Sequence, residues 1–337
     1  MRARPGIAGA HVTEGAPLLE VRGLHVHYPG REGPARAVDG VDLTVHQGET
    51  VALVGESGCG KTTLARTIMG LHRPDAGEIR LRGEPLDYRR AGMREHRRHA
   101  QMIFQDPTGA LNARQTLYEA VAEGIRIQGL EGNEEELVAA ALSRAGLRPP
   151  ESFFTRYPYE ISGGQRQRVI IAGAMVLNPS LLVADEPVSA LDASVRGEIL
   201  ALMLGLVRDA GVTVLVVTHD LGLAWNVADR VAVMYLGRIV EDAPAEQLLT
   251  DPQHPYTRAL LSVVPETKHM EPQILKGETP DPTRIPPGCR FHPRCPLVES
   301  GEAARLGIEE RCRTEDPLFL PACHAVRSAS RSASVAS

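Results

Sequence analysis

The stretch VALVGESGCGKTTLARTIMG, residues 51–70, decides the fold. Its first four residues are apolar, as in a strand buried on both faces, and residues 61–70 are typical of a helix. Between them, residues 55–62 match the phosphate-binding pattern G-x-x-x-x-G-K-[ST]. In such a loop, backbone N–H groups point at phosphate oxygens and the following helix adds positive partial charge. The flanking strand and helix disfavour a chance glycine turn.

The pattern therefore predicts a site for a nucleoside phosphate. Lys61 is expected to reach the β- and γ-phosphates, Thr62 to bind Mg²⁺, and Cys59 to be a loop residue rather than a metal ligand. The predicted binding residues are Gly55, Glu56, Ser57, Gly58, Cys59, Gly60, Lys61, Thr62 and Thr63.

Working outward, residues 181–184, 213–217 and 231–235 form further apolar runs, separated by helical stretches. This order predicts an α/β core with a parallel sheet and right-handed crossovers. Residues 19–28 and 41–45 alternate apolar and polar side chains, which favours an antiparallel edge layer. Residues from about 106 to 168 predict a helical insertion, with one helix beginning after the N-cap Asn133 and ending near Gly146.

The 337 residues allow one main domain and a small appendage. We expect disordered tails at 1–17 and 326–337, a main domain at 18–265, and an irregular extension rich in Pro, Arg and Cys at 266–325. A formal charge of −5 disfavours a nucleic-acid partner. No apolar run suits a spanning helix, and the first residues lack a signal-peptide pattern, so a cytosolic location is expected.

Catalytic chemistry is predicted at LLVADEP, residues 181–187. An apolar strand that ends in Asp185 places a carboxylate where it can hold Mg²⁺ through water, and Glu186 is placed to act as general base. Seen alone, the two acids could form a solvated turn. His219 follows the next apolar run and is expected to hydrogen-bond the γ-phosphate and the base, although a lone histidine is more often structural.

Residues 161–165, ISGGQ, resemble the ABC signature motif, usually written LSGGQ, with Ile in the first position. The resemblance covers about residues 19–265 and implies an ATP-hydrolysing transporter subunit with a RecA-like core. Further motifs occur in the family's order. By resemblance, Tyr28 stacks on adenine, Gln105 is the Q-loop glutamine and an Mg²⁺ ligand, residues 189–192 form the D-loop with Asp192, and His219 is the switch histidine.

The signature also implies a paired assembly. A Ser-Gly-Gly turn that opens a helix is a second anion site. In the family it lies too far from its own phosphate loop, so Ser162, Gly163, Gly164 and Gln165 would close over ATP held by another subunit. The resemblance further implies two separate transmembrane permease subunits that dock at the helical insertion.

Several stretches resemble the oligopeptide/dipeptide importer branch, above all HPYTRALL at 254–261. The sequence of these stretches is similar to that of the F-type ATPase subunit. This resemblance implies a D-type partner ATPase, an extracytoplasmic solute-binding protein and a place at the cytoplasmic face of the membrane. Nickel and glycan-fragment importers share these motifs, so nickel and glycan fragments remain alternative cargoes. A soluble ABC ATPase is disfavoured by the single cassette and negative charge, and an inactive regulatory module by Lys61, Asp185, Glu186 and His219.

Four cysteines are spaced C-x5-C-x16-C-x10-C near the end of the chain: Cys289, Cys295, Cys312 and Cys323. Such thiolates can hold zinc or an iron–sulfur cluster in a segment too small for its own core. Spacing leaves both open, as well as unliganded thiols, and His292 or His324 could replace a cysteine around zinc. The resemblance favours a [4Fe–4S] cluster.

Overall fold

The computed structural model describes residues 16–30, 32–189, 191–264 and 271–326. The predicted disordered tails lie almost entirely outside these residues. Where the described part begins, strand β1 starts at Pro17, two residues before the expected start of the alternating pattern. No helix in the described ranges combines the length and the apolar character needed to cross a bilayer.

The core is a six-stranded sheet in the order β10-β9-β3-β8-β7-β6. Five neighbouring strands are parallel, and only β10 runs antiparallel to β9. The predicted apolar runs form its central strands, and all five residues of β3 and of β7 are buried. The strands are β3 Thr50–Val54, β6 Ala100–Ile103, β7 Leu181–Asp185, β8 Thr213–Thr218, β9 Arg230–Tyr235 and β10 Arg238–Pro244.

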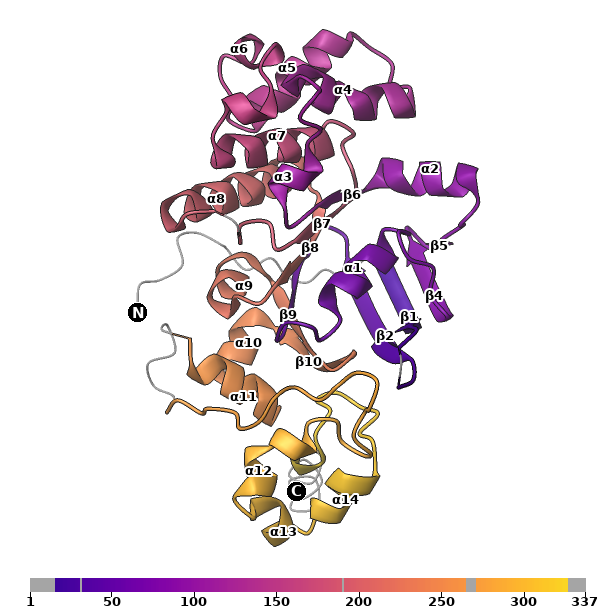
Figure 1. The fold of residues 1–337 in the computed structure, drawn as a ribbon, viewed down its shortest axis with the longest axis vertical. Coiled ribbons are helices and arrows are strands. Elements are labelled where there is room, and N and C mark those ends of the chain that lie inside the picture. The colour runs from indigo at the N-terminus through magenta and orange to yellow at the C-terminus, as the bar shows by residue number, and fades with distance from the viewer. Residues whose placement is uncertain (1–15, 31, 190, 265–270, 327–337) are drawn as a thin grey trace.

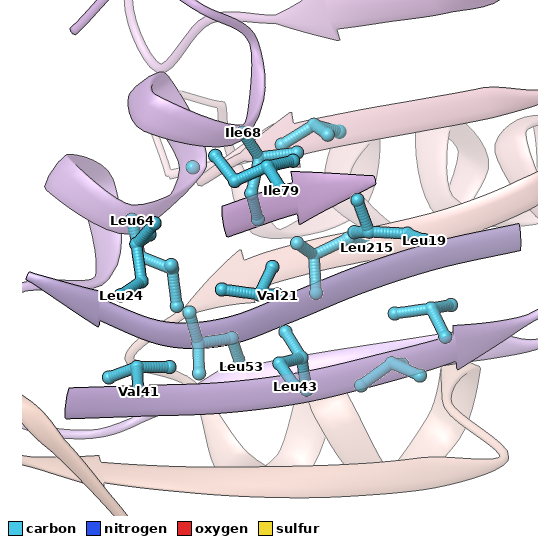
Figure 2. Packing of buried hydrophobic residues seen from close by; sticks show 14 of the residues in the cluster. Leu19, Val21, Leu24, Val41, Leu43, Leu53, Leu64, Ile68, Ile79 and Leu215 are labelled. Carbon is cyan, nitrogen blue, oxygen red and sulfur yellow. The ribbon is translucent and has the colours of Figure 1, made fainter. Parts of the chain in front are cut away.

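A second, antiparallel sheet has the order β2-β1-β4-β5 and confirms the predicted edge layer. Its strands are β1 Pro17–Tyr28, β2 Ala35–His46, β4 Ala76–Leu81 and β5 Glu84–Pro85. Helix α1, Lys61–Ile68, packs between the two sheets. Figure 2 shows Leu24 of β1 beside Leu64 of α1 and Leu53 of β3, within one buried cluster. Because this cluster fixes α1, it also fixes the loop that precedes the helix.

The helical insertion lies at one end of the molecule (Figure 1). Helix α5 confirms its predicted boundaries, since the Asn133 side chain caps it and Gly146 follows it with φ 78°. The cluster that holds the insertion together continues to Val176, beyond the expected helical stretch. Its elements are α3 Pro107–Ala110, α4 Leu117–Gln128, α5 Glu134–Arg144, α6 Glu151–Phe154, the 3-10 turn η1 Pro158–Glu160 and α7 Gly163–Met175.

The remaining helices cover the core sheet or follow it. They are α2 Arg90–His99, α8 Ala193–Ala210, α9 Leu221–Val227, α10 Ala245–Thr250 and α11 Pro255–Ser262.

Residues 271–326, which we call the extension, lie at the opposite end of the molecule from the helical insertion (Figure 1). The extension contains the 3-10 turn η2 His292–Arg294 and the short helices α12 Pro296–Glu299, α13 Glu302–Arg305 and α14 Glu309–Thr314. Phe291 is buried against Tyr235 of β9 and Tyr256 of α11, so the extension packs on the main domain.

Candidate functional site

The phosphate loop joins the carboxyl end of β3 to the first residue of α1. Gly55 and Gly60 have φ of 152° and 110°, and both lie against backbone. A Cβ atom on Gly60 would sit 2.0 Å from the carbonyl oxygen of Ala37, and one on Gly55 would sit 2.1 Å from that of Met234. The strand, loop and helix thus follow one another in the order that the phosphate-loop pattern requires, and close backbone contacts require glycine at these two positions.

Lys61 lies across this loop. Its Nζ donates hydrogen bonds to the carbonyl oxygens of Gly55 and Glu56, both at 2.8 Å. The buried thiol of Cys59 lies 3.7 Å from the same nitrogen, and burial raises its pKa. The ammonium group is therefore fixed over the loop, where the residues fit the phosphates of a nucleotide.

Two sets of hydrogen-bonded side chains lie beside the loop, at the carboxyl ends of β7 and β8: Thr62 with Asp185, and Glu186 with His219 and Gln105. Thr62 donates through Oγ1 to Oδ1 of Asp185 at 3.2 Å, which suits a shared Mg²⁺. Burial raises the pKa of Asp185. Glu186 lies next in the chain, and its Oε1 is 2.7 Å from Nδ1 of His219. Its Oε2 accepts a hydrogen bond from Nε2 of Gln105 at 3.4 Å.

Glu186 has an unusual backbone, with φ 45° in a residue that is not glycine. Its N–H donates to the carbonyl oxygen of Val217 at 2.8 Å, which holds this conformation. Such local strain persists only where the surroundings impose it and is concentrated at functional sites. The Glu186 side chain remains 15 % exposed, so water can reach it.

The signature residues lie at the start of α7, and Figure 1 shows α7 well separated from α1. Ser162 is the N-cap: its Oγ accepts from the N–H of Gln165 at 3.3 Å, and Oε1 of Gln165 accepts from the N–H of Ser162 at 3.1 Å. Ser162 and Gly163 are exposed. The structure thus brings together Lys61, Asp185, Glu186, Gln105 and His219, and leaves the signature turn facing solvent.

The other predicted nucleotide contacts lie at the surface. The Tyr28 ring is 37 % exposed and meets His72 edge to face, with centroids 5.8 Å apart. Asp192 is exposed, and Oγ of Ser189 donates to the carbonyl oxygen of Glu186 at 3.1 Å. Ala190 lies outside the described residues.

The prediction of a metal centre at the four C-terminal cysteines is wrong. No three of Cys289, Cys295, Cys312 and Cys323 bring their sulfur atoms within 4.8 Å of one another. The cavity that they line measures about 10 Å³, room for about one water molecule, and its other walls include Leu297, Val298, Ile308 and three histidines, His254, His292 and His324. Burial raises the pKa of Cys289 to about 12 and that of Cys312 to about 11. Because the sulfur atoms do not converge, this arrangement fits neither an iron–sulfur cluster nor a zinc ion held by these cysteines.

Contacts between the phosphate loop and the C-terminal part of the chain do not follow from any sequence motif. The hydroxyl of Tyr256 accepts a hydrogen bond from the N–H of Glu56 at 2.9 Å. The Glu56 carboxylate accepts hydrogen bonds from Arg294 of the extension. The stretch around Tyr256 carries only a family resemblance, and no local pattern connects Arg294 with a loop 238 residues earlier.

A phosphate loop between a strand of a parallel sheet and a helix, with an acidic residue and a histidine paired beside it, is the arrangement of a P-loop ATPase. Family models match residues 38–189, described as "ABC transporter", and residues 240–301, described as "Oligopeptide/dipeptide transporter, C-terminal region". The chain belongs to the ABC transporter family, in its oligopeptide/dipeptide branch. The comparisons confirm the family and fold class predicted from the motifs, and the family hydrolyses ATP with Mg²⁺.

Curated relatives match most of the chain. A Brucella ovis ATP-binding protein named for peptide import is 45 % identical over 286 residues, which cover 84 % of this chain and 90 % of that protein. The oligopeptide transport ATP-binding protein AppF of Bacillus subtilis is 43 % identical over 298 residues, which cover 84 % of this chain and 90 % of that protein.

Solved structures match the ATPase core. A dimeric ATP-binding cassette bound to ADP and Pi has a TM-score of 0.61 and 29 % identity, and the match covers 67 % of this chain and 98 % of that one. The cbiO1 protein of Clostridium perfringens, part of the ABC transporter complex cbiONQ, has a TM-score of 0.62 and 28 % identity, over 75 % and 98 % of the two chains.

Proposed function

We propose that this chain is the ATP-hydrolysing subunit of an importer of dipeptides or oligopeptides, and that it works at the cytoplasmic face of the cell membrane. The names of the relatives and the matched C-terminal region support peptides as the cargo. The observation that carries the enzymatic part is the Glu186–His219 hydrogen bond beside the Thr62–Asp185 pair.

In this proposal Glu186 is the general base. Water attacks the γ-phosphorus of ATP, its proton passes to the Glu186 carboxylate, and the bond from that phosphorus to the bridging oxygen of ADP breaks to release ADP and phosphate. His219 orients the carboxylate through Nδ1, and Gln105 holds its other oxygen. Mg²⁺, bound by Thr62, Asp185 and Gln105, would neutralise charge on the phosphates. Lys61 binds the β- and γ-phosphates, and Tyr28 stacks on the adenine.

The exposed signature turn supports a paired assembly. Ser162, Gly163 and Gly164 at the start of α7 offer backbone N–H groups to an anion, but the described part of this chain holds no cradle against them. We propose that they close over ATP held by a second, D-type subunit, with Asp192 at the same interface. That a related cassette is dimeric with ADP and Pi bound supports this arrangement.

The remaining partners in this proposal are two membrane permeases and an extracytoplasmic solute-binding protein. Permease docking at the helical insertion is supported by large apolar side chains that are exposed there: Ile127 at 58 % and Tyr159 at 69 %. Phe104, beside Gln105, is 38 % exposed and would connect such a surface to the catalytic site.

The substitution Glu186→Gln tests the enzymatic proposal. It keeps the size of the side chain but removes the base, so we expect the ATPase rate of the assembled transporter to fall at least about 100-fold. Equilibrium binding of ATP should persist, since the cradle is untouched. Glu246→Gln, at an exposed position on α10, is the matched control and should keep the wild-type rate. An E186Q transporter that hydrolyses ATP at the wild-type rate would exclude Glu186 as the base.

The cargo is tested separately, by reconstituting the subunit with the permeases and the binding protein. ATP-dependent uptake should be seen for labelled di- to pentapeptides and should be absent for Ni²⁺ and for glycan fragments. Uptake of either of the latter in place of peptides would overturn the peptide assignment and leave the ATPase proposal intact.

A further inference from the structure

The phosphate loop is held from outside by the extension. Glu56, its second residue, accepts a bidentate pair of hydrogen bonds from Arg294, from Nη1 to Oε2 at 2.7 Å and from Nη2 to Oε1 at 3.1 Å. Thr279 donates to the same carboxylate at 2.9 Å. The Arg294 side chain is only 7 % exposed, and that of Glu56 is 27 % exposed. A bidentate pair at this depth is a directed contact, not a surface ion pair.

The turn at residues 290–294, which carries Arg294, also contacts the ATPase core at a second point. Arg290, four residues before Arg294, is buried and pairs with Asp39 of β2, and its Nη1 donates to the carbonyl oxygen of Leu236 at 2.7 Å. Cys289 and Cys295 flank the turn and are buried with it. Because two arginines on one buried turn hold separate parts of the core, the position of Arg294 is well defined.

The Glu56 carboxylate is a negative charge in a loop whose predicted ligand is a triphosphate. Burial alone would raise its pKa, but the hydrogen bonds from Arg294 and Thr279 outweigh this and hold the pKa below its ordinary value, so the group is charged at neutral pH. Lys61 also interacts electrostatically with this carboxylate. An unneutralised Glu56 would therefore repel the phosphates and compete with them for Lys61.

We infer that Arg294 is a positioning residue for nucleotide binding: it neutralises Glu56 and keeps its carboxylate directed away from Lys61 and the phosphates. Through this pair, the affinity of the loop for ATP depends on how the extension is docked. The extension is then part of the ATP site, although it contributes no group that touches the nucleotide. This inference concerns ATP binding alone and stands whatever the transported solute is.

Equilibrium binding of MgATP to the purified full-length subunit tests the inference. Arg294→Met removes the charge and keeps the bulk of the side chain, and should raise the Kd for ATP about tenfold, the effect of one uncompensated charge near a partly screened site. Arg294→Lys keeps the charge without the bidentate geometry, and should raise the Kd by no more than about threefold. The double variant Arg294→Met/Glu56→Gln removes both charges and should return the Kd to within about twofold of wild type.

The double variant separates this inference from a purely structural role. If Arg294 merely held the extension in place, removing its partner would not restore ATP binding, so a double variant as weak as R294M would overturn the inference. A wild-type Kd in R294M would do the same. Arg284→Gln is the matched control. Arg284 lies in the same extension and forms an exposed ion pair with Glu32, which is outside the extension, so this variant should bind ATP with the wild-type Kd.

If R294M cannot be purified, E56Q and R294M/E56Q are compared with each other. With the carboxylate gone, Arg294 has nothing to neutralise, so their Kd values should agree within about twofold. A Kd at least about fivefold higher in the double variant would show that Arg294 acts by another route, and would overturn the inference.

Discussion

At the scale of single residues, His254 shows how a buried titratable group makes stability depend on pH. It is the N-cap of α11: its Nδ1 accepts from the N–H of Tyr256 at 3.1 Å, and its Nε2 lies 3.2 Å from the carbonyl oxygen of Ala322. Both contacts are satisfied by a neutral imidazole with the proton on Nε2. Burial lowers the pKa of His254 from 6.5 to about 4.

We therefore expect a loss of stability in mild acid. The unfolded chain protonates this histidine below about pH 6.5, whereas the folded chain does so only near pH 4. The stabilising contribution is thus complete above pH 6.5 and falls as the pH drops toward 4. A shift of this size is worth about 3 kcal/mol at most. Urea denaturation at pH 7.5, 5.5 and 4.5 measures the fall in the free energy of unfolding.

The variant His254→Asn isolates this contribution. Its amide oxygen keeps a cap acceptor but cannot titrate, so the variant should be less stable at pH 7.5 and should lose less stability between pH 7.5 and 4.5. An unchanged pH dependence in H254N would show that other groups control the acid sensitivity.

Which residues could be predicted depends on how far along the chain their partners lie. Lys61, Thr62, Asp185 and Glu186 are encoded by contiguous patterns, in which the spacing of strand, loop and helix sets the geometry. Their prediction as a site remains to be tested by variants. The Arg294–Glu56 pair joins positions 238 residues apart and follows from tertiary packing alone. No local pattern in the sequence specifies it.

At the scale of elements, we have proposed that the start of α7 binds the nucleotide held by another subunit, and this proposal can be tested. The variant Ser162→Arg places a bulky cation where the capping hydroxyl and free N–H groups would meet phosphate. In the assembled transporter, trapping of labelled nucleotide on the partner ATPase should fall about tenfold or more, because that cradle loses its second half. Trapping on this chain's own cradle should persist. Mass spectrometry of the separated subunits measures both.

A matched control is Ser152→Arg, an exposed position in the same helical insertion, which should leave both cradles occupied. If S162R instead emptied its own cradle and spared the partner, the two anion sites would belong to one nucleotide, and the proposed pairing would be wrong.

The elements that were predicted are those with a clear periodicity. Strand β1 alternates and β3 is apolar from Val51 to Val54, whereas β5 has two residues and β6 only four, too few to show a pattern. At the four C-terminal cysteines, by contrast, the sequence predicts a metal centre that the fold does not form. Their spacing is compatible with metal binding, but spacing does not determine whether four thiols converge, and in the fold they pack against leucine, valine and isoleucine.

At the scale of the whole molecule, the extension shares a hydrophobic core with the ATPase domain. One buried cluster includes Val54 of β3, Tyr235 of β9, Tyr256 of α11 and Phe291 of the extension. The Phe291 ring meets Tyr235 with centroids 5.3 Å apart and Tyr256 at 5.4 Å, and it is 1 % exposed. A buried core shared between the two parts favours their folding together.

We therefore predict that the extension and the ATPase core unfold as one cooperative unit. Phe291→Ala leaves a cavity among the rings of Tyr235, Tyr256 and His254 and should lower the free energy of unfolding by about 3 to 5 kcal/mol. Leu318→Ala, at a position 80 % exposed in the same extension, should change it by less than about 0.5 kcal/mol. Calorimetry and tryptophan fluorescence at Trp225, which packs against the shared cluster, should report one coincident transition in both proteins. Two separate transitions, with F291A shifting only one of them, would mean that the extension is an independent domain, and the route from Arg294 to the phosphate loop would then connect two bodies rather than one.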